Sequence, residues 1–322
     1  MKMDVKKWHD KFIEALDKKY PKRSHLVQAL KDLLGIEREA VYRRLRNEVV
    51  FSTREIIEIS IAWNISIDRL IGVSSGPIPF HLQPVNYIDP SEQELNFLRQ
   101  IIESIYSLKD FPDVEFMDVC NKLPRQFIAG YKYLNQFYLF KWKYQQSNEK
   151  QTVMYSQVKT SEAKLKLTAD YYQAIKNVPQ SNFIFDYMLF DYLANDIRYF
   201  NAIGMITNEE KELIKNDLYN LLEYLSIVAT NGCYPETQNK VNLYISRLNV
   251  DTNYSYSCTN QMKICFIHVF DKYEIHTFDP EMTENFITWM QLKKRAAFQV
   301  TEVDKISSIE YFSKQRQLIE SI

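Results

Sequence analysis

The segment that most constrains the fold is residues 25–47, HLVQALKDLLGIEREAVYRRLRN. The apolar residues from Leu26 to Leu33 recur at helical spacing, which predicts an amphipathic helix, and Gly35 is a typical residue at a helix C-terminus. A second helix is predicted from about Glu37 to Asn47. Its inward face carries Ala40, Val41 and Leu45, and its outward face carries Arg38, Glu39, Tyr42, Arg43 and Arg46. Two short helices joined by a glycine turn, the second polar and basic, are typical of a helix-turn-helix, although an ordinary helical hairpin with solvated charges has the same pattern.

The next residues along the chain extend this pattern. Ser52 and Glu55 have the spacing of a capping box, which predicts that another helix begins there. Residues 60–72, SIAWNISIDRLIG, resemble the closing helices of the lambda-repressor/Cro-like DNA-binding family, in which an alanine-containing helix ends at Asn and a short helix ending in glycine comes next. The resemblance covers Asp4 to Gly72. It implies a five-helix domain over residues 1–72, DNA binding through the third helix, and homodimers.

The chain departs from the pattern of that family at two positions. The family favours a small residue four positions before the glycine, where this chain has Lys31. It also favours an apolar residue three positions after Val41, where this chain has Arg44. We therefore expect either an altered crossing of the second and third helices or contacts from Lys31 and Arg44 to DNA phosphates.

The predicted third helix supplies side chains suited to reading bases. An arginine guanidinium pairs bidentately with the O6 and N7 atoms of guanine, which suits Arg43 and Arg46. Glu39 could accept from a cytosine amine, and Tyr42 could contact a thymine methyl group. The full set of expected DNA-binding residues is Lys31, Arg38, Glu39, Tyr42, Arg43, Arg44 and Arg46.

The length of 322 residues suits more than one domain. Residues 91–322 are expected to form a larger body. Residues 73–90 contain four of the 10 prolines and are predicted to be an ordered linker, part of it an extended strand docked on that body. Hydrophobic residues make up 46% of the chain and glycines number only 6, which favours a packed, mainly helical protein over a disordered one.

The body is expected to be mainly α with a small antiparallel sheet near its C-terminus, an α+β fold. Residues 113–121 and 183–201 are predicted to be helices. Four short alternating runs between residues 241 and 278 predict an antiparallel meander. Residues 297–301 are a candidate fifth strand, and residues 304–322 a final helix.

Aromatic residues in the body suggest a ligand pocket for an apolar or flat molecule. The candidates are Tyr133, Phe137, Phe140, Phe183, Tyr187 and Phe190. The alternative is that these side chains form the core of the body, because aromatic residues dominate cores by area alone. In that case the body is a docking surface for a partner protein.

The distribution of charge separates the two halves. Residues 1–72 contain 15 Lys and Arg against 11 Asp and Glu, a net charge of +4, whereas the remainder carries −5. A basic head on an acidic body places any nucleic-acid surface on the head.

Other function classes find little support in the sequence. No apolar run approaches the length of a membrane span, no secretory signal is evident and the 4 cysteines form no CxxC pair, so we expect a cytoplasmic protein with reduced thiols. Cys258, Cys265, His268 and His276 lie close in sequence, but Cys265 and His268 should face opposite sides of a strand, so no metal site is predicted. No catalytic or cofactor motif appears, so neither an enzyme nor a cofactor is predicted.

Two functional hypotheses remain. The first is a sequence-specific DNA-binding transcription regulator, similar in layout to large bacterial regulators, whose body dimerises and senses a ligand or partner. The second is an interaction scaffold or an unrecognised enzyme carrying a degenerate helix-turn-helix. The sequence does not reveal the operator, the effector, or whether the regulator activates or represses.

Overall fold

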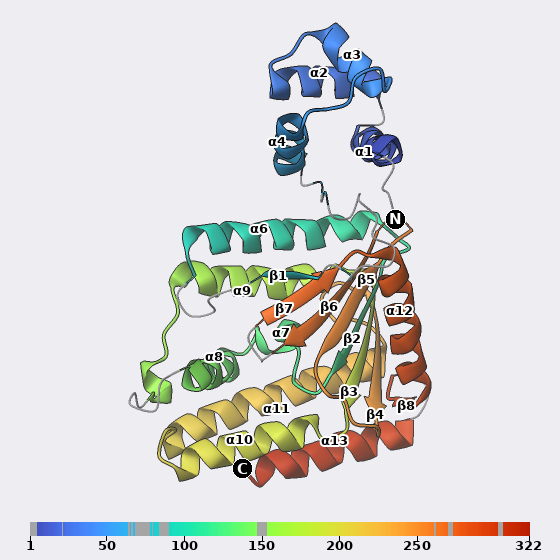
Figure 1. The fold of residues 1–322 in the computed structure, drawn as a ribbon. Helices are drawn as coiled ribbons and strands as arrows, with labels where there is room; N and C mark the ends of the chain where they lie inside the picture. Colours follow the sequence, from blue (N-terminus) through green and yellow to red (C-terminus); the bar gives the residue numbers. More distant parts are fainter. Residues whose placement is uncertain are drawn as a thin grey trace. The chain divides into compact units, whose positions relative to one another are not determined.

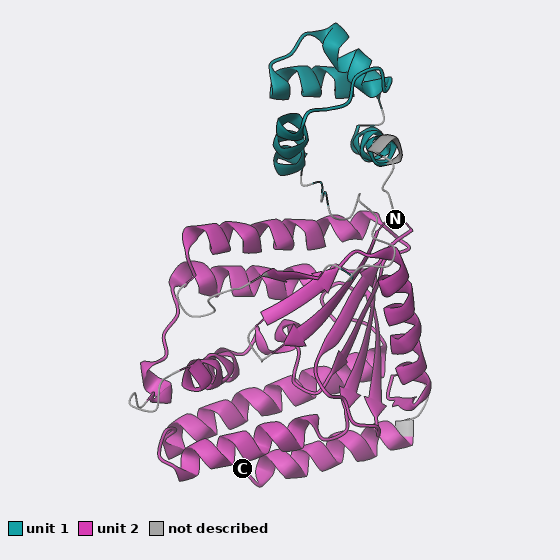
Figure 2. Cartoon of the chain, viewed as in Figure 1, with its two compact units in different colours: residues 1–79 teal, residues 80–322 magenta. Residues whose placement is uncertain are grey.

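The computed structural model describes residues 5–20, 22–63, 65, 67, 78, 80–83, 90–146, 153–260, 262–269, 273–301 and 305–322. The chain divides into two compact units, unit 1 over Met1–Pro79 and unit 2 over Phe80–Ile322 (Figure 2). Each unit has a hydrophobic core of its own.

Unit 1 contains four helices within its described residues: α1 (Val5–Lys19), α2 (Arg23–Leu34), α3 (Arg38–Leu45) and α4 (Thr53–Trp63). Gly35 ends α2 in the left-handed conformation, with φ 63°, and donates its backbone N–H to the Lys31 carbonyl. The predicted glycine turn between α2 and α3 is therefore present. The prediction of five helices is corrected to these four, and the expected fifth falls on residues 66–71, of which only residue 67 is described.

The core of unit 1 comes from all four helices. Its fully buried side chains include Phe12, Leu16, Leu26, Leu30, Val41 and Ile59. The capping box at the start of α4 is formed as predicted: Ser52 donates its N–H to Glu55 Oε2 at 2.7 Å, and Glu55 donates its N–H to Ser52 Oγ at 3.3 Å.

Unit 2 is built on an eight-stranded mixed sheet with the strand order β1-β7-β6-β5-β2-β3-β4-β8 (Figure 1). The strands are β1 (His81–Gln83), β2 (Glu115–Cys120), β3 (Gln180–Asp186), β4 (Lys240–Ser246), β5 (Tyr254–Cys258), β6 (Lys263–Val269), β7 (Tyr273–Thr277) and β8 (Ala297–Gln299). The central strands β2, β3 and β4 are parallel, and every other pairing is antiparallel.

Helices cover both faces of this sheet. The helices of unit 2 are α6 (Glu92–Ser107), α7 (Arg125–Ile128), α8 (Lys132–Gln146), α9 (Glu162–Ile175), α10 (Leu189–Ala202), α11 (Asn208–Asn231), α12 (Pro280–Arg295) and α13 (Lys305–Glu320), with short 3-10 turns at Leu108–Asp110 and Tyr155–Gln157. The core on one face joins Phe183, Phe185 and Leu243 to side chains from α8, α10, α11 and α13. α12 lies on the other face of the sheet (Figure 1). There Ile184 and Tyr244 belong to a second core cluster with Phe286 and Met290 of α12.

The predicted fold class is therefore wrong, because the sheet is the centre of unit 2 and spans it from β1 to β8. The predicted helix at 113–121 is strand β2, and the predicted helix at 183–201 is strand β3 followed by α10. Strands buried on both faces lose the alternation of apolar and polar residues by which strands are usually recognised. The meander from β5 to β7 is antiparallel as predicted, but β4 pairs in parallel with β3.

Strand β1 ties the start of unit 2 to the sheet. Its three residues pair antiparallel with β7, and His81 stacks on His276 with ring centroids 5.4 Å apart. The predicted linker therefore contributes an extended strand at the sheet edge, while its residues 73–77, 79 and 84–89 lie outside the described part of the chain.

Candidate nucleic-acid interface

The solvent-facing side of α3 carries a row of cations. Arg38, Arg43 and Arg46 are exposed, and so is Glu39. The Tyr42 ring lies between two of the arginines, with its centroid 5.8 Å from the Arg38 Cζ atom and 5.7 Å from the Arg46 Cζ atom. Residues four apart lie one above the other on a helix, so Arg38, Tyr42 and Arg46 form one stacked column on a single face.

Surface carboxylates pair with the guanidinium groups of Arg43 and Arg46. Arg46 Nη2 is 3.3 Å from Glu39 Oε1, and Arg46 Nη1 is 3.2 Å from Glu48 Oε1. Arg43 Nε is 3.8 Å from Glu48 Oε2. Exposed ion pairs of this kind contribute only about 0–1 kcal/mol, so the arginines can exchange these partners for phosphates or base edges at little cost.

Arg44 has a different role from the other arginines of α3. Its Nη2 atom is 2.7 Å from Glu55 Oε1, its Nε donates to Glu55 Oε2 at 3.0 Å, and its Nη1 donates to the Ala40 carbonyl. The two side chains are only 18% and 12% exposed. Burial raises the pKa of Glu55, but hydrogen bonds from Arg44 and Ser52 outweigh burial and leave this pKa below its usual value. Arg44 thus joins α3 to α4 and replaces the apolar residue expected at this position.

Lys31 lies in the last turn of α2 and is half-buried. No hydrogen bond or ion pair of its ammonium group is found among the described residues. It therefore remains a candidate for a phosphate contact, whereas Arg44 is already committed to Glu55.

Three residues that the sequence analysis did not single out position the end of α3. Asn47 takes a left-handed conformation with φ 62°, and its side chain pairs with His9 and Asp10 of α1. His9 is fully buried, and its Nε2 accepts the Phe51 N–H at 3.1 Å. Arg23 donates to the Leu45 carbonyl at 2.9 Å. The one available signal was the asparagine itself, which tolerates left-handed backbone better than most residues.

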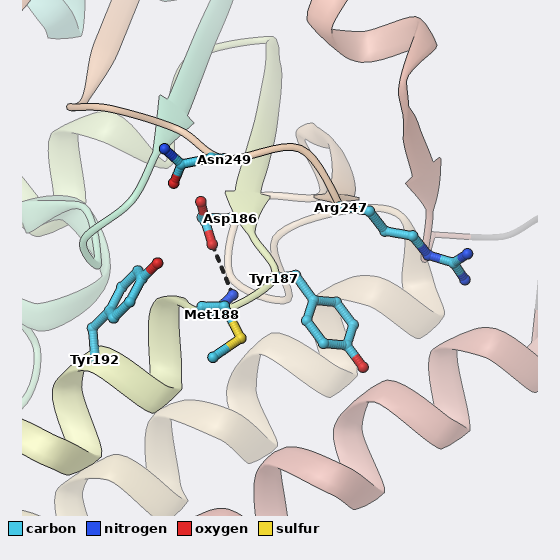
Figure 3. A pocket seen from close by; sticks show the side chains of 6 residues that line it. All are labelled: Asp186, Tyr187, Met188, Tyr192, Arg247 and Asn249. Carbon is cyan, nitrogen blue, oxygen red and sulfur yellow. Dashed lines mark hydrogen bonds between the residues drawn. The ribbon is translucent and has the colours of Figure 1, made fainter.

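Unit 2 contains a pocket of about 400 Å³ at the carboxyl ends of β3 and β4 (Figure 3). It is lined by Asp186, Tyr187, Met188, Tyr192, Arg247 and Asn249. Ligands of open α/β sheets commonly bind at this edge. Asp186 organises the pocket, because its Oδ1 accepts the Met188 N–H at 2.8 Å and its Oδ2 accepts the Val250 N–H at 2.9 Å.

Most of the predicted ligand-binding aromatic residues lie elsewhere. Phe137, Phe140, Phe183 and Phe190 are buried in the core of unit 2, and Tyr133 packs against that core. Only Tyr187 lines the pocket. The other lining residues come from two segments about sixty positions apart, residues 186–192 and 247–249, and no local sequence pattern joins them.

A second polar group lies near the carboxyl end of β2. Asp118 is 7% exposed and accepts a hydrogen bond from Gln126 Nε2 at 2.9 Å. Burial raises the pKa of Asp118 to about 6, although hydrogen bonds from Cys120 and Gln126 partly offset this. His268 Nε2 is 3.1 Å from Glu274 Oε2 on the neighbouring strand. In the part of the chain that the structure describes, no group of three or more His, Cys, Asp or Glu side chains could hold a metal ion.

Compared with known protein families, curated proteins and solved structures, the chain matches none. Among the described residues, no helix combines the length and apolar character needed to cross a lipid bilayer. Two features of the structure bear on function: a basic helix face on unit 1 and a pocket at the sheet edge of unit 2.

Proposed function

We propose that the protein is a sequence-specific DNA-binding transcription regulator that uses α3 as its reading helix. The observation that carries this proposal is that the arginines of α3 differ in burial and in their partners. Arg44 is paired with Glu55 inside unit 1, whereas Arg38, Arg43 and Arg46 share the exposed side of the helix.

A reading helix needs a rigid support, because side chains must reach base edges with defined geometry. The supports of α3 are the Arg44–Glu55 pair, the glycine turn before the helix and the Asn47 turn after it. A surface hairpin without a binding role does not require this support, which here consists of a buried ion pair, a buried histidine and a left-handed asparagine beside the exposed helix.

Unit 2 supplies the regulatory part of this proposal. Its sheet-edge pocket is large enough for a small molecule, since ligand sites commonly measure about 300–1,000 Å³. If occupancy of the pocket changes DNA affinity, DNA changes ligand affinity by the same factor. A regulator of this kind would act on DNA in the cytoplasm.

The test is a mobility-shift assay with fragments of the source genome and the full-length protein, in a large excess of unrelated duplex. We expect one or a few fragments to be retained at a protein concentration that leaves the rest free. Arg43→Ala should lose this preference, whereas Arg54→Ala, which alters an exposed arginine of α4, should keep it. Equal retention of every fragment by the unaltered protein would contradict the proposal.

A further inference from the structure

Helix α10 is apolar on two sides. Its inner face, Leu189, Phe190, Leu193, Ala194, Ile197 and Phe200, is buried in the core of unit 2. Its outer face carries four further large apolar side chains that the described part of the chain leaves uncovered: Met188, Tyr192, Tyr199 and Ile203 are 40%, 44%, 52% and 44% exposed. A surface helix typically carries polar or charged side chains on the face opposite its core, so these four apolar side chains require an explanation.

The four exposed side chains lie along one side of the helix as two pairs, Met188 with Tyr192 and Tyr199 with Ile203, separated by Asn195 and Asp196; they are called here the α10 stripe. At 100° per residue, Met188, Tyr192, Tyr199 and Ile203 fall within about 60° of one another. They extend over about 22 Å, from the residue that caps the N-terminus of α10 to the residue that caps its C-terminus. Large apolar side chains exposed along one side of a helix are typical of interaction surfaces, and tyrosine is enriched at such surfaces.

The four side chains of the α10 stripe are spaced symmetrically about the middle of the helix. This symmetry points to a second copy of the chain as the partner. Met188 and Ile203 are equally far from the midpoint between Asn195 and Asp196, and so are Tyr192 and Tyr199. A two-fold axis through that midpoint would set Tyr192 against Tyr199 of a second copy and Met188 against Ile203 of that copy. A two-fold interface requires this kind of self-complementary surface.

We propose that two copies of this chain form a homodimer by packing α10 against α10 in antiparallel orientation. The helix dipoles then oppose each other, which is favourable. On one flank of the axis Asn195 meets the same amide of the second copy, and amides can both donate and accept. On the other flank Asp196 carries its own counter-ion, Lys141, so the two carboxylates approach as neutralised pairs.

The size of the stripe is consistent with a dimer contact. Its four side chains would together remove apolar surface on the order of 400 Å² per copy, about half of what each partner buries in a standard interface. The polar flanks supply the remainder. Because Met188 and Tyr192 also line the pocket at the sheet edge, the interface would lie directly beside the pocket.

The first test is light scattering of the full-length protein without DNA, so its outcome is independent of any role of α3. We expect a dimer, and we expect Tyr199→Arg and Ile203→Arg each to raise the dimer dissociation constant at least tenfold while retaining the circular dichroism of the unaltered protein. The matched control is Ile227→Arg on α11, which is 47% exposed and lies outside the stripe. A monomer, or a dimer that both stripe variants leave intact, would overturn the proposal.

The second test establishes the orientation by disulfide formation between copies. Asn195→Cys lies next to the proposed axis, so its thiol should crosslink readily to the second copy. Ala202→Cys is exposed and lies on the same flank, but it would be about 20 Å along the helix from its symmetry mate and should not crosslink. An equimolar mixture of Tyr192→Cys and Tyr199→Cys should crosslink only between the two variants. Crosslinking of Ala202→Cys to itself would contradict the antiparallel arrangement.

Discussion

Arg44 on α3 and Glu55 on α4 form a two-point ion pair, with Nη2 2.7 Å from Oε1 and Nε 3.0 Å from Oε2. The same glutamate accepts the Ser52 N–H and so also caps α4. One carboxylate therefore fixes both the start of α4 and its position against α3. The sequence departs from the lambda-repressor/Cro-like pattern at Arg44, and Glu55 is the residue that accommodates the departure.

Breaking this pair should destabilise unit 1. Arg44→Ala leaves the Glu55 carboxylate without its counter-ion, and we expect a loss of about 2–4 kcal/mol, somewhat below that for a fully buried pair. Arg44→Met combined with Glu55→Gln should lose less than the two single changes together, because neither residue is then left charged and unpaired. Hydrogen exchange of the α3 amides in the full chain measures both effects. Strictly additive losses would show that the two residues do not stabilise each other.

The exposed arginines should act on DNA affinity and leave stability unchanged. Arg43→Ala is expected to cost about 1–3 kcal/mol on the preferred site and to relax specificity there. Lys31→Ala should weaken binding to all sequences similarly and flatten the salt dependence, because a phosphate contact carries no sequence information. Fluorescence anisotropy over a salt series distinguishes the two patterns. Unchanged affinity in Arg43→Ala would remove that residue from the interface.

Asp118 should make the stability of unit 2 depend on pH. Its pKa is raised by burial to about 6, above the usual 3.8, so the folded protein holds a proton more tightly than the unfolded chain. The carboxyl group therefore costs nothing below about pH 4; its destabilising effect grows between about pH 4 and pH 6, where only the unfolded chain releases the proton, and reaches about 3 kcal/mol above pH 6.

The corresponding variant is Asp118→Asn, which keeps an acceptor for Gln126 and has no charge. We expect it to raise the melting temperature at pH 7.5 and to have a smaller effect at pH 5. Asp110→Asn, at an exposed aspartate, should change neither value. A gain of equal size at both pH values would mean that the ionisation of Asp118 is not the cause.

Local signals in the sequence predicted unit 1 better than unit 2. The turn at Gly35 and the capping box at Ser52 each depend on residues a few positions apart, and both are present in the structure. The five-helix prediction was wrong, since the described residues of unit 1 form four helices and most of residues 66–71 lie outside the described part of the chain.

Long-range pairing explains the errors in unit 2. In β2, Met117 and Val119 face α12 while Cys120 faces the core on the opposite side, so apolar residues occupy both faces and the strand pattern disappears. β3 is followed by α10 after only two residues, and the break depends on Asp186, whose side chain accepts the Met188 N–H. The partners of these strands lie about sixty residues or more away in sequence.

The most direct test of DNA reading by α3 is selection of a random-sequence duplex library by the full-length protein, with sequencing of the retained DNA. We predict an enriched inverted repeat, with half-sites separated by about one helical turn or a multiple of it, because a two-fold dimer presents two copies of α3. The double variant Arg43→Ala, Arg46→Ala should enrich no motif, whereas Arg54→Ala should enrich the same one. Failure of the unaltered protein to enrich any motif, or recovery of the same motif by the double variant, would contradict the assignment of α3 as the reading helix.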